Sequence, residues 1–188
     1  MGVPLVIYIT LDHLLKWRAE GDPLVLLLKE AFGPNTSTDD PLPISGILDR
    51  LGLDDALECL ALVDDYESEK RLLSVFAARK VEHLLTDSRS LIAIDVAERF
   101  ANGEAMVQEL IDAEDGAEAA VSLLAFSIGV PKEVRYACQA ARWCVVSGYT
   151  AVDLCAWNVM RALPAPEREL VRAAISQELR SILGRHGN

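Results

Sequence analysis

Basic residues are scarce in this chain. It has 18 lysines and arginines and 29 aspartates and glutamates, which gives a formal net charge of −11 at pH 7. A field of this sign repels polyphosphate backbones and anionic lipid headgroups. Aromatic residues make up 6% of the chain, fewer than the stacking surfaces of single-stranded nucleic-acid binders need. We therefore expect no direct nucleic-acid or membrane partner, and a core built from leucine, valine, isoleucine and alanine.

Long hydrophobic runs and a leader segment are missing as well. No apolar run approaches the roughly 18 residues of a membrane-spanning helix. Residues 1–10 have neither the basic segment nor the small-residue cleavage site of a signal peptide. No C-x-x-C pair occurs among the four cysteines, which lie in apolar helical contexts: Cys59, Cys138, Cys144 and Cys155. Such thiols behave as small apolar residues and predict a reduced, cytoplasmic protein.

The motifs of common enzymes are also absent. The sequence has no H-E-x-x-H zinc motif, no glycine-rich phosphate loop and no G-x-S-x-G nucleophile turn. Its paired acids stand at loops or at expected helix starts, where carboxylates complement the helix dipole. We expect no catalytic, metal or cofactor site, and hence a protein that is not an enzyme.

One enzyme hypothesis remains open. His83 precedes Asp87 by four residues, so the two would share a helix face if the helix reached that far, with Arg89 close by. Asp87 equally suits the N-cap of the following helix, which favours a structural use.

Helical periodicity is what the chain does have. From residue 45 onward, leucine, valine and alanine recur at the spacing of one helix face, between caps and stops formed by Asp, Ser, Pro and Gly. This pattern predicts an all-α fold, a compact bundle or array of nine or ten helices. Residues 3–9 are rich in β-branched side chains, and a faint repeat places a second extended start near residue 44. The two segments would pair as a small β-ribbon.

The length of 188 residues suits one domain. Residues 33–43 are rich in Pro, Ser, Thr and Asp and form the clearest loop. We expect a single helical domain, 1–188, in which a subdivision would separate an N-terminal segment, 1–43, from a helical core, 44–188. Within the core we expect two separate helices over 105–113 and 117–128.

Negative charge is concentrated in two blocks. Residues 1–70 carry 14 acids against 5 bases, and residues 104–127 carry 6 acids and no base. The second block supplies the candidate partner-binding acids Glu109, Asp112, Glu114 and Asp115. Solvated acidic faces that only aid solubility are the simpler interpretation.

Trp17 and Arg89 are further candidates for partner binding, because tryptophan and arginine dominate interface hot spots. Trp17 lies on the first expected helix, and Arg89 lies at a turn between two helices. The large aromatic residues of 136–157 are expected in the core rather than at a contact.

Residues 70–104 carry the most specific local pattern. It consists of Arg71-Leu72, Ala77, HLLTDSRS at 83–90 and DVAERFANGE at 95–104. The pattern resembles a family of alanine-rich helical proteins from bacteria and phages, some of which are labelled immunity proteins. The chain departs from that family over 104–127, which is acidic where the family has tryptophan-containing repeats. The resemblance implies a helical fold and a bacterial or phage setting, and it brings no catalytic residues.

Four functional hypotheses follow. We favour a non-enzymatic protein-binding module of the immunity or inhibitor type, whose acidic surface engages a basic partner such as a toxin, a nuclease or a defence component. The second is a phage anti-defence protein, comparable to an anti-CRISPR, that mimics nucleic acid. The third is an enzyme with a site around His83, Asp87 and Arg89. The fourth is a homo-oligomer built on the aromatic C-terminal third.

Overall fold

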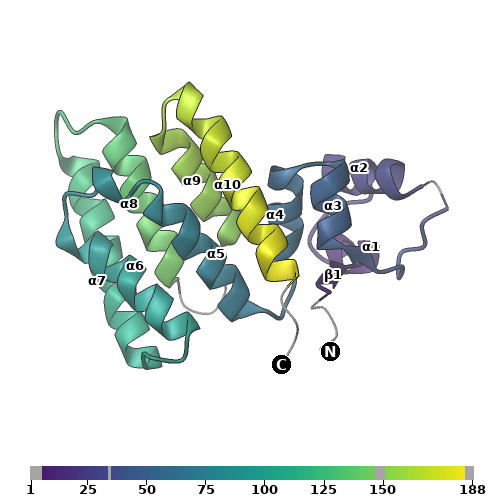
Figure 1. Cartoon of the computed structure of the whole chain (residues 1–188), viewed down its shortest axis with the longest axis horizontal. Coiled ribbons are helices and arrows are strands. Elements are labelled where there is room, and N and C mark those ends of the chain that lie inside the picture. The colour runs from purple at the N-terminus through teal and green to yellow at the C-terminus, as the bar shows by residue number, and fades with distance from the viewer. Residues whose placement is uncertain (1–5, 34, 147–150, 185–188) are drawn as a thin grey trace. The chain divides into compact units, whose positions relative to one another are not determined.

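The computed structural model describes residues 6–33, 35–146 and 151–184. They form ten α-helices, a short 3-10 helix and a two-stranded sheet (Figure 1). The first elements are β1 (Tyr8–Ile9), α1 (Leu11–Leu15), α2 (Pro23–Phe32), β2 (Leu42–Pro43), α3 (Ile44–Arg50) and α4 (Leu53–Ala61). They are followed by α5 (Glu67–Arg79), η1 (Glu82–Leu84), α6 (Ser88–Ala101), α7 (Val107–Phe126), α8 (Lys132–Val145), α9 (Val152–Ala162) and α10 (Ala165–Leu183). The prediction of an all-α fold with a small ribbon is confirmed.

Contacts divide the chain into two compact units. The first unit comprises Met1–Asp65 and Ser176–Asn188, and the second comprises Tyr66–Ile175. The loop at 33–43 lies inside the first unit, so this division falls after Asp65 rather than at residue 43. α10 contributes residues to both units. That the whole chain is one domain stays a prediction.

The first unit contains the ribbon. β1 and β2 pair antiparallel, with Ile9 opposite Leu42. Ile9 is buried and Tyr8 is exposed, the alternation of a strand with one covered face. Thr10 and Asp22 cap α1 and α2 by accepting hydrogen bonds from backbone N–H groups in the first turn of each helix. These caps fix the residues at which α1 and α2 begin.

The second unit packs its helices through small side chains. α8 packs against α9 and against α6 and α7, and α5 packs against α6, α8 and α9 (Figure 1). The contacting faces carry fully buried alanines, namely Ala93, Ala97, Ala137, Ala140 and Ala141. Small residues at such positions let neighbouring helix backbones approach closely. The low aromatic content of the sequence therefore matches an alanine-lined core.

The expected break between two helices in the acidic block is wrong. A single helix, α7, runs through Val107–Phe126 in place of separate helices over 105–113 and 117–128. Its buried stripe of Leu110, Ala113, Ala117 and Ala120 keeps one register across Gly116. A glycine inside a helix costs about 1 kcal/mol relative to alanine, and burial of this stripe outweighs that cost.

Across the described residues, none of the helices combines the length and the apolar character that a bilayer crossing requires.

Candidate functional site: the acidic face of α7

α7 is held at its start and along one side, which leaves its other side open to solvent. The backbone N–H of Met106 donates to the Glu109 carboxylate at 3.0 Å, which satisfies a group at the helix N-terminus. The buried stripe of the helix faces α6 and α8. Helical periodicity then directs the intervening residues outward.

The outward side carries four neighbouring exposed residues at helical spacing, Gln108, Ile111, Asp112 and Asp115. We call these four residues the acidic α7 face. The Gln108 side chain donates to the Asp112 carboxylate at 2.9 Å, which orients that carboxylate. Within the described part of the chain, neither Asp112 nor Asp115 has an ion-pair partner. Ile111, beside them on the same side of the helix, is 37% exposed. The face therefore combines two unneutralised carboxylates with an apolar side chain.

The other two candidate acids of this block are not part of that face. Arg99 donates to Glu109 at 2.8 Å, so that the charge of Glu109 is offset. The backbone hydrogen bond from Met106, and then the bond from Arg99, lower the pKa of Glu109 below its ordinary value. Glu114 is half-buried and already interacts within the protein. Among the described residues, Asp112 and Asp115 thus have no ion-pair partner, whereas Glu109 and Glu114 interact within the protein.

Arg89 lies near α7 but is committed to another carboxylate. It donates through Nη2 and Nε to Asp87 at 2.6 and 3.0 Å, while Asp87 also accepts the Arg89 backbone N–H and caps α6. A Cβ placed on Gly116 would lie 3.8 Å from the Arg89 Cβ, so the arginine packs beside the middle of α7. In this structure Arg89 holds the Asp87 carboxylate at the N-terminus of α6.

Trp17 lies in the first unit, just beyond α1, and is 71% exposed. Its neighbour Arg18 pairs with Asp22 and Glu58. Trp17 remains a candidate contact residue of the first unit, separate from the acidic α7 face.

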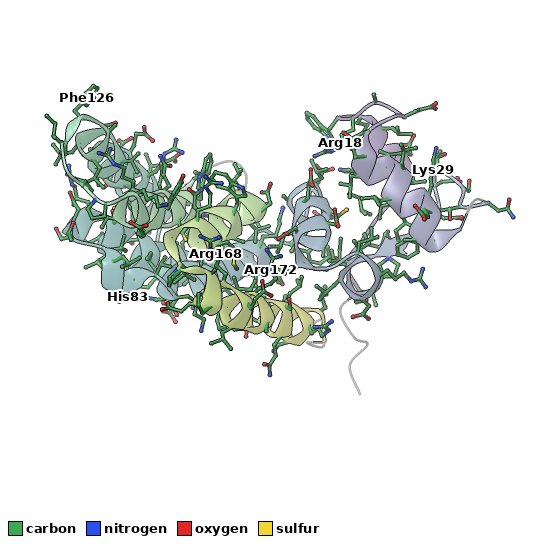
Figure 2. The ribbon with its side chains drawn as sticks, turned by 90° about the horizontal axis from the view of Figure 1, so that it is seen from above. Arg18, Lys29, His83, Phe126, Arg168 and Arg172 are labelled. Atoms are coloured by element: carbon green, nitrogen blue, oxygen red, sulfur yellow. The ribbon has the colours of Figure 1, made fainter. Side chains whose placement is uncertain are left out.

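The residues of the enzyme hypothesis are not assembled into one site. His83 is exposed in η1, and Figure 2 shows it at the surface of the second unit. Among the described residues, no hydrogen bond or ion pair joins His83 to Asp87 or Arg89. The same part of the chain contains no cluster of three or more His, Cys, Asp and Glu side chains suited to a metal ion. An enzymatic activity stays an untested hypothesis.

An aromatic groove that the sequence did not indicate lies between α8 and α9. Trp157, expected in the core, is 52% exposed. Its Tyr136 neighbour packs edge-on to it, and Arg161 lies over both rings. The spacing of Leu154, Trp157 and Arg161 places the three residues on one face of α9, but it does not indicate whether that face is buried or exposed.

Comparison of the chain with protein-family models, with curated proteins and with solved structures finds no match. The function must therefore be argued from the residues of the chain itself.

Proposed function

We propose that this chain is a non-enzymatic binding protein of the immunity or inhibitor type, which engages a basic protein partner through the acidic α7 face. The observation that carries the proposal is the pair of exposed carboxylates, Asp112 and Asp115, one turn apart and without an ion-pair partner in the described residues. Other acids of the same block, such as Glu109 and Glu118, are offset by arginines.

The composition of the face suits a protein partner. Interfaces combine a desolvated apolar centre with polar groups around it. Ile111 offers such a centre, and the two aspartates offer acceptors for lysine or arginine side chains. The negative charge would accelerate encounter with a basic protein, and salt would weaken this effect because the carboxylates are exposed.

A bacterial, cytoplasmic setting belongs to the same proposal. All four cysteines are free and buried, as suits a reducing compartment. A toxin, a nuclease or a component of a defence system is the kind of basic partner that such a protein would neutralise.

Affinity purification from the native host tests the proposal. The wild-type chain is compared with the double variant Asp112→Lys/Asp115→Lys. A matched control is Glu167→Lys/Glu169→Lys, which changes the net charge equally on exposed positions of α10. We expect a basic protein to co-purify with wild type and control at low salt, and to be lost from the α7 variant and at high salt. A partner retained by the α7 variant contradicts the proposal.

The nucleic-acid mimic is distinguished by competition. If the acidic α7 face occupied a nucleic-acid-binding groove of the partner, excess duplex DNA or RNA of the partner's substrate type would displace the protein, as charge reversal does. A complex that excess nucleic acid does not affect would exclude the mimic and favour the immunity or inhibitor role.

A further inference from the structure

A groove of about 460 Å³ lies between α8 and α9 in the second unit. Tyr136, Trp143, Leu154 and Trp157 provide its apolar walls. The volume is within the range of natural ligand pockets and holds one or two large side chains. The groove uses none of the residues of the acidic α7 face.

Cations rather than carboxylates accompany the aromatic rings. The rings of Tyr136 and Trp157 are 6.1 Å apart at an angle of 87°, an edge-to-face pair. The guanidinium of Arg161 lies 4.5 Å from the Trp157 ring centre and 5.0 Å from that of Tyr136. Arg142 lies 4.7 Å from the Trp143 ring centre. Stacking of this kind holds arginine side chains in fixed positions beside the groove.

The local charge is opposite to that of the protein as a whole. Among the described residues, none of those that line the groove is acidic. Lys132 is an exposed lining residue, and Arg161 is exposed beside the groove. In the described ranges neither of these two cations has a carboxylate partner. Arg142 differs, because Glu118 offsets its charge. The groove therefore offers two free positive charges in a chain of net charge −11.

The floor of the groove has an unused acceptor. Asn158 is only 5% exposed and lines the groove. Its side-chain N–H group donates to the Leu154 carbonyl oxygen at 2.8 Å. Over the described part of the chain, its side-chain oxygen accepts no hydrogen bond. The oxygen is therefore an acceptor that a ligand N–H group entering the groove can reach.

Exposed apolar residues continue beyond one end of the groove. Arg135 lines the groove and donates to the carbonyl oxygens of Leu124, in the last turn of α7, and of Ser127, which follows the helix. Phe126, the last residue of α7, is 88% exposed, and Ile128 in the following turn is fully exposed. Figure 2 shows the Phe126 side chain projecting outward from the end of its own helix. A surface of this extent suits a polypeptide better than a small molecule.

We infer that the α8–α9 groove binds an acidic segment of a partner protein. An apolar or aromatic side chain of the segment fills the space between Trp143 and Trp157. Its carboxylates meet Lys132 and Arg161, and a backbone N–H group donates to Asn158. Tryptophan, tyrosine and arginine are the residues that dominate interface hot spots. This surface is independent of the acidic α7 face, and the chain would thereby recognise two partners of opposite charge.

Selection from a display library of short random peptides tests this inference on the intact chain. Wild type is compared with Lys132→Glu/Arg161→Glu. The matched control is Arg50→Glu/Lys80→Glu, which reverses two other cations that lie over aromatic rings, those of Phe32 and Phe76. We expect wild type and control to enrich peptides with Asp or Glu around one large apolar residue. The groove variant should lose this enrichment while keeping a wild-type helical circular dichroism spectrum.

The best enriched peptide is then titrated as a synthetic probe, with tryptophan fluorescence as the readout. Replacing its acids by the corresponding amides should weaken binding about tenfold. Absence of enrichment, enrichment of basic or neutral peptides, or an unchanged selection by the groove variant would overturn the inference. Displacement of the peptide by adenosine monophosphate would also overturn the inference, because the groove would then bind a small aromatic anion. Self-association of the chain that the groove variant abolishes would overturn it as well, because the occupant would then be a second copy. Asp112→Lys/Asp115→Lys should select the same peptides as wild type. The peptide selection therefore tests the groove independently of the proposal for the acidic α7 face.

Discussion

Arg71 of α5 donates a hydrogen bond of 3.2 Å to the carbonyl oxygen of Val146, 75 positions later in the chain. The same guanidinium donates to the Cys144 carbonyl oxygen, so one buried side chain satisfies two carbonyl groups at the end of α8. Arg71 is only 4% exposed and also lies over the Phe100 ring at 5.5 Å. Burial lowers its pKa below the ordinary arginine value. Arg71 thereby links α5 to the C-terminal end of α8.

Replacement of Arg71 by methionine should therefore destabilise the protein strongly. The variant keeps most of the side-chain volume but leaves two acceptors without donors, which costs about 2–4 kcal/mol in the free energy of unfolding. Lysine should not restore stability, because an ammonium group lacks the planar fork that reaches both carbonyls. Urea unfolding followed by circular dichroism measures the effect. A loss no larger than that of Arg99→Met, at a more exposed site, would contradict this role.

The pair of Asp87 and Arg89 predicts a pH-dependent contribution to stability. The hydrogen bond from Arg89 lowers the pKa of Asp87 below its ordinary value. A carboxyl group with a lowered folded-state pKa stabilises the protein above the unfolded value of about 3.9 and loses that effect as the pH falls through the folded value. Asp87→Asn keeps an N-cap acceptor and removes the charge.

We expect Asp87→Asn to be less stable than wild type by about 0.5–1 kcal/mol at neutral pH, a small value because Arg89 is partly exposed. The difference should shrink toward zero below about pH 4. Chemical denaturation across this range is the measurement. A difference that grows on acidification would show that the charge of Asp87 is not what stabilises the α6 terminus.

Arg79 predicts salt-sensitive stability. It donates to Asp95 and Glu98 of α6 at 2.6 and 2.8 Å, and to Glu82 at 2.8 Å. Arg79→Ala should cost about 1 kcal/mol at low ionic strength, because exposed pairs are individually weak but this residue makes three. The cost should fall in molar salt. Arg99→Ala, which removes a single pair with Glu109, should cost less when thermal unfolding of both variants is compared.

The cysteines predict slow thiol chemistry in the native protein. All four are free and buried. Burial raises the pKa of Cys59 to about 12, so its reactive thiolate is scarce at neutral pH. Cys144 and Cys155 have sulfur atoms 3.9 Å apart inside the second unit. Labelling with a chromogenic disulfide reagent should be slow without denaturant and complete for four thiols in urea. Rapid labelling of any thiol in the native state would contradict this packing.

The local parts of the fold could be predicted from sequence, and the partners between helices could not. Asp87 caps α6 as the sequence suggested, and Thr10 and Asp22 cap α1 and α2 in the same way, because a cap depends on residues two or three positions away. Periodicity likewise indicated the helices. Two separate helices were expected over 105–113 and 117–128, yet burial of alanines on both sides of Gly116 keeps α7 continuous.

The charge count indicated an acidic segment at 104–127, but it could not show which acids are left unpaired. That depends on arginines contributed by other helices. Arg99 reaches forward to Glu109, and Arg142 reaches back to Glu118. The groove was missed for the same reason: the exposure of Trp157 is decided by how α9 packs on α8, which no local pattern specifies.

The rate at which the chain associates with its co-purified partner, measured against ionic strength, tests the central claim most directly. If the acidic α7 face makes the contact, the association rate constant of wild type falls steeply as salt rises. Asp112→Lys/Asp115→Lys should lower the low-salt rate constant about tenfold or more, with Glu167→Lys/Glu169→Lys close to wild type. A rate constant indifferent both to salt and to reversal of Asp112 and Asp115 would contradict the claim.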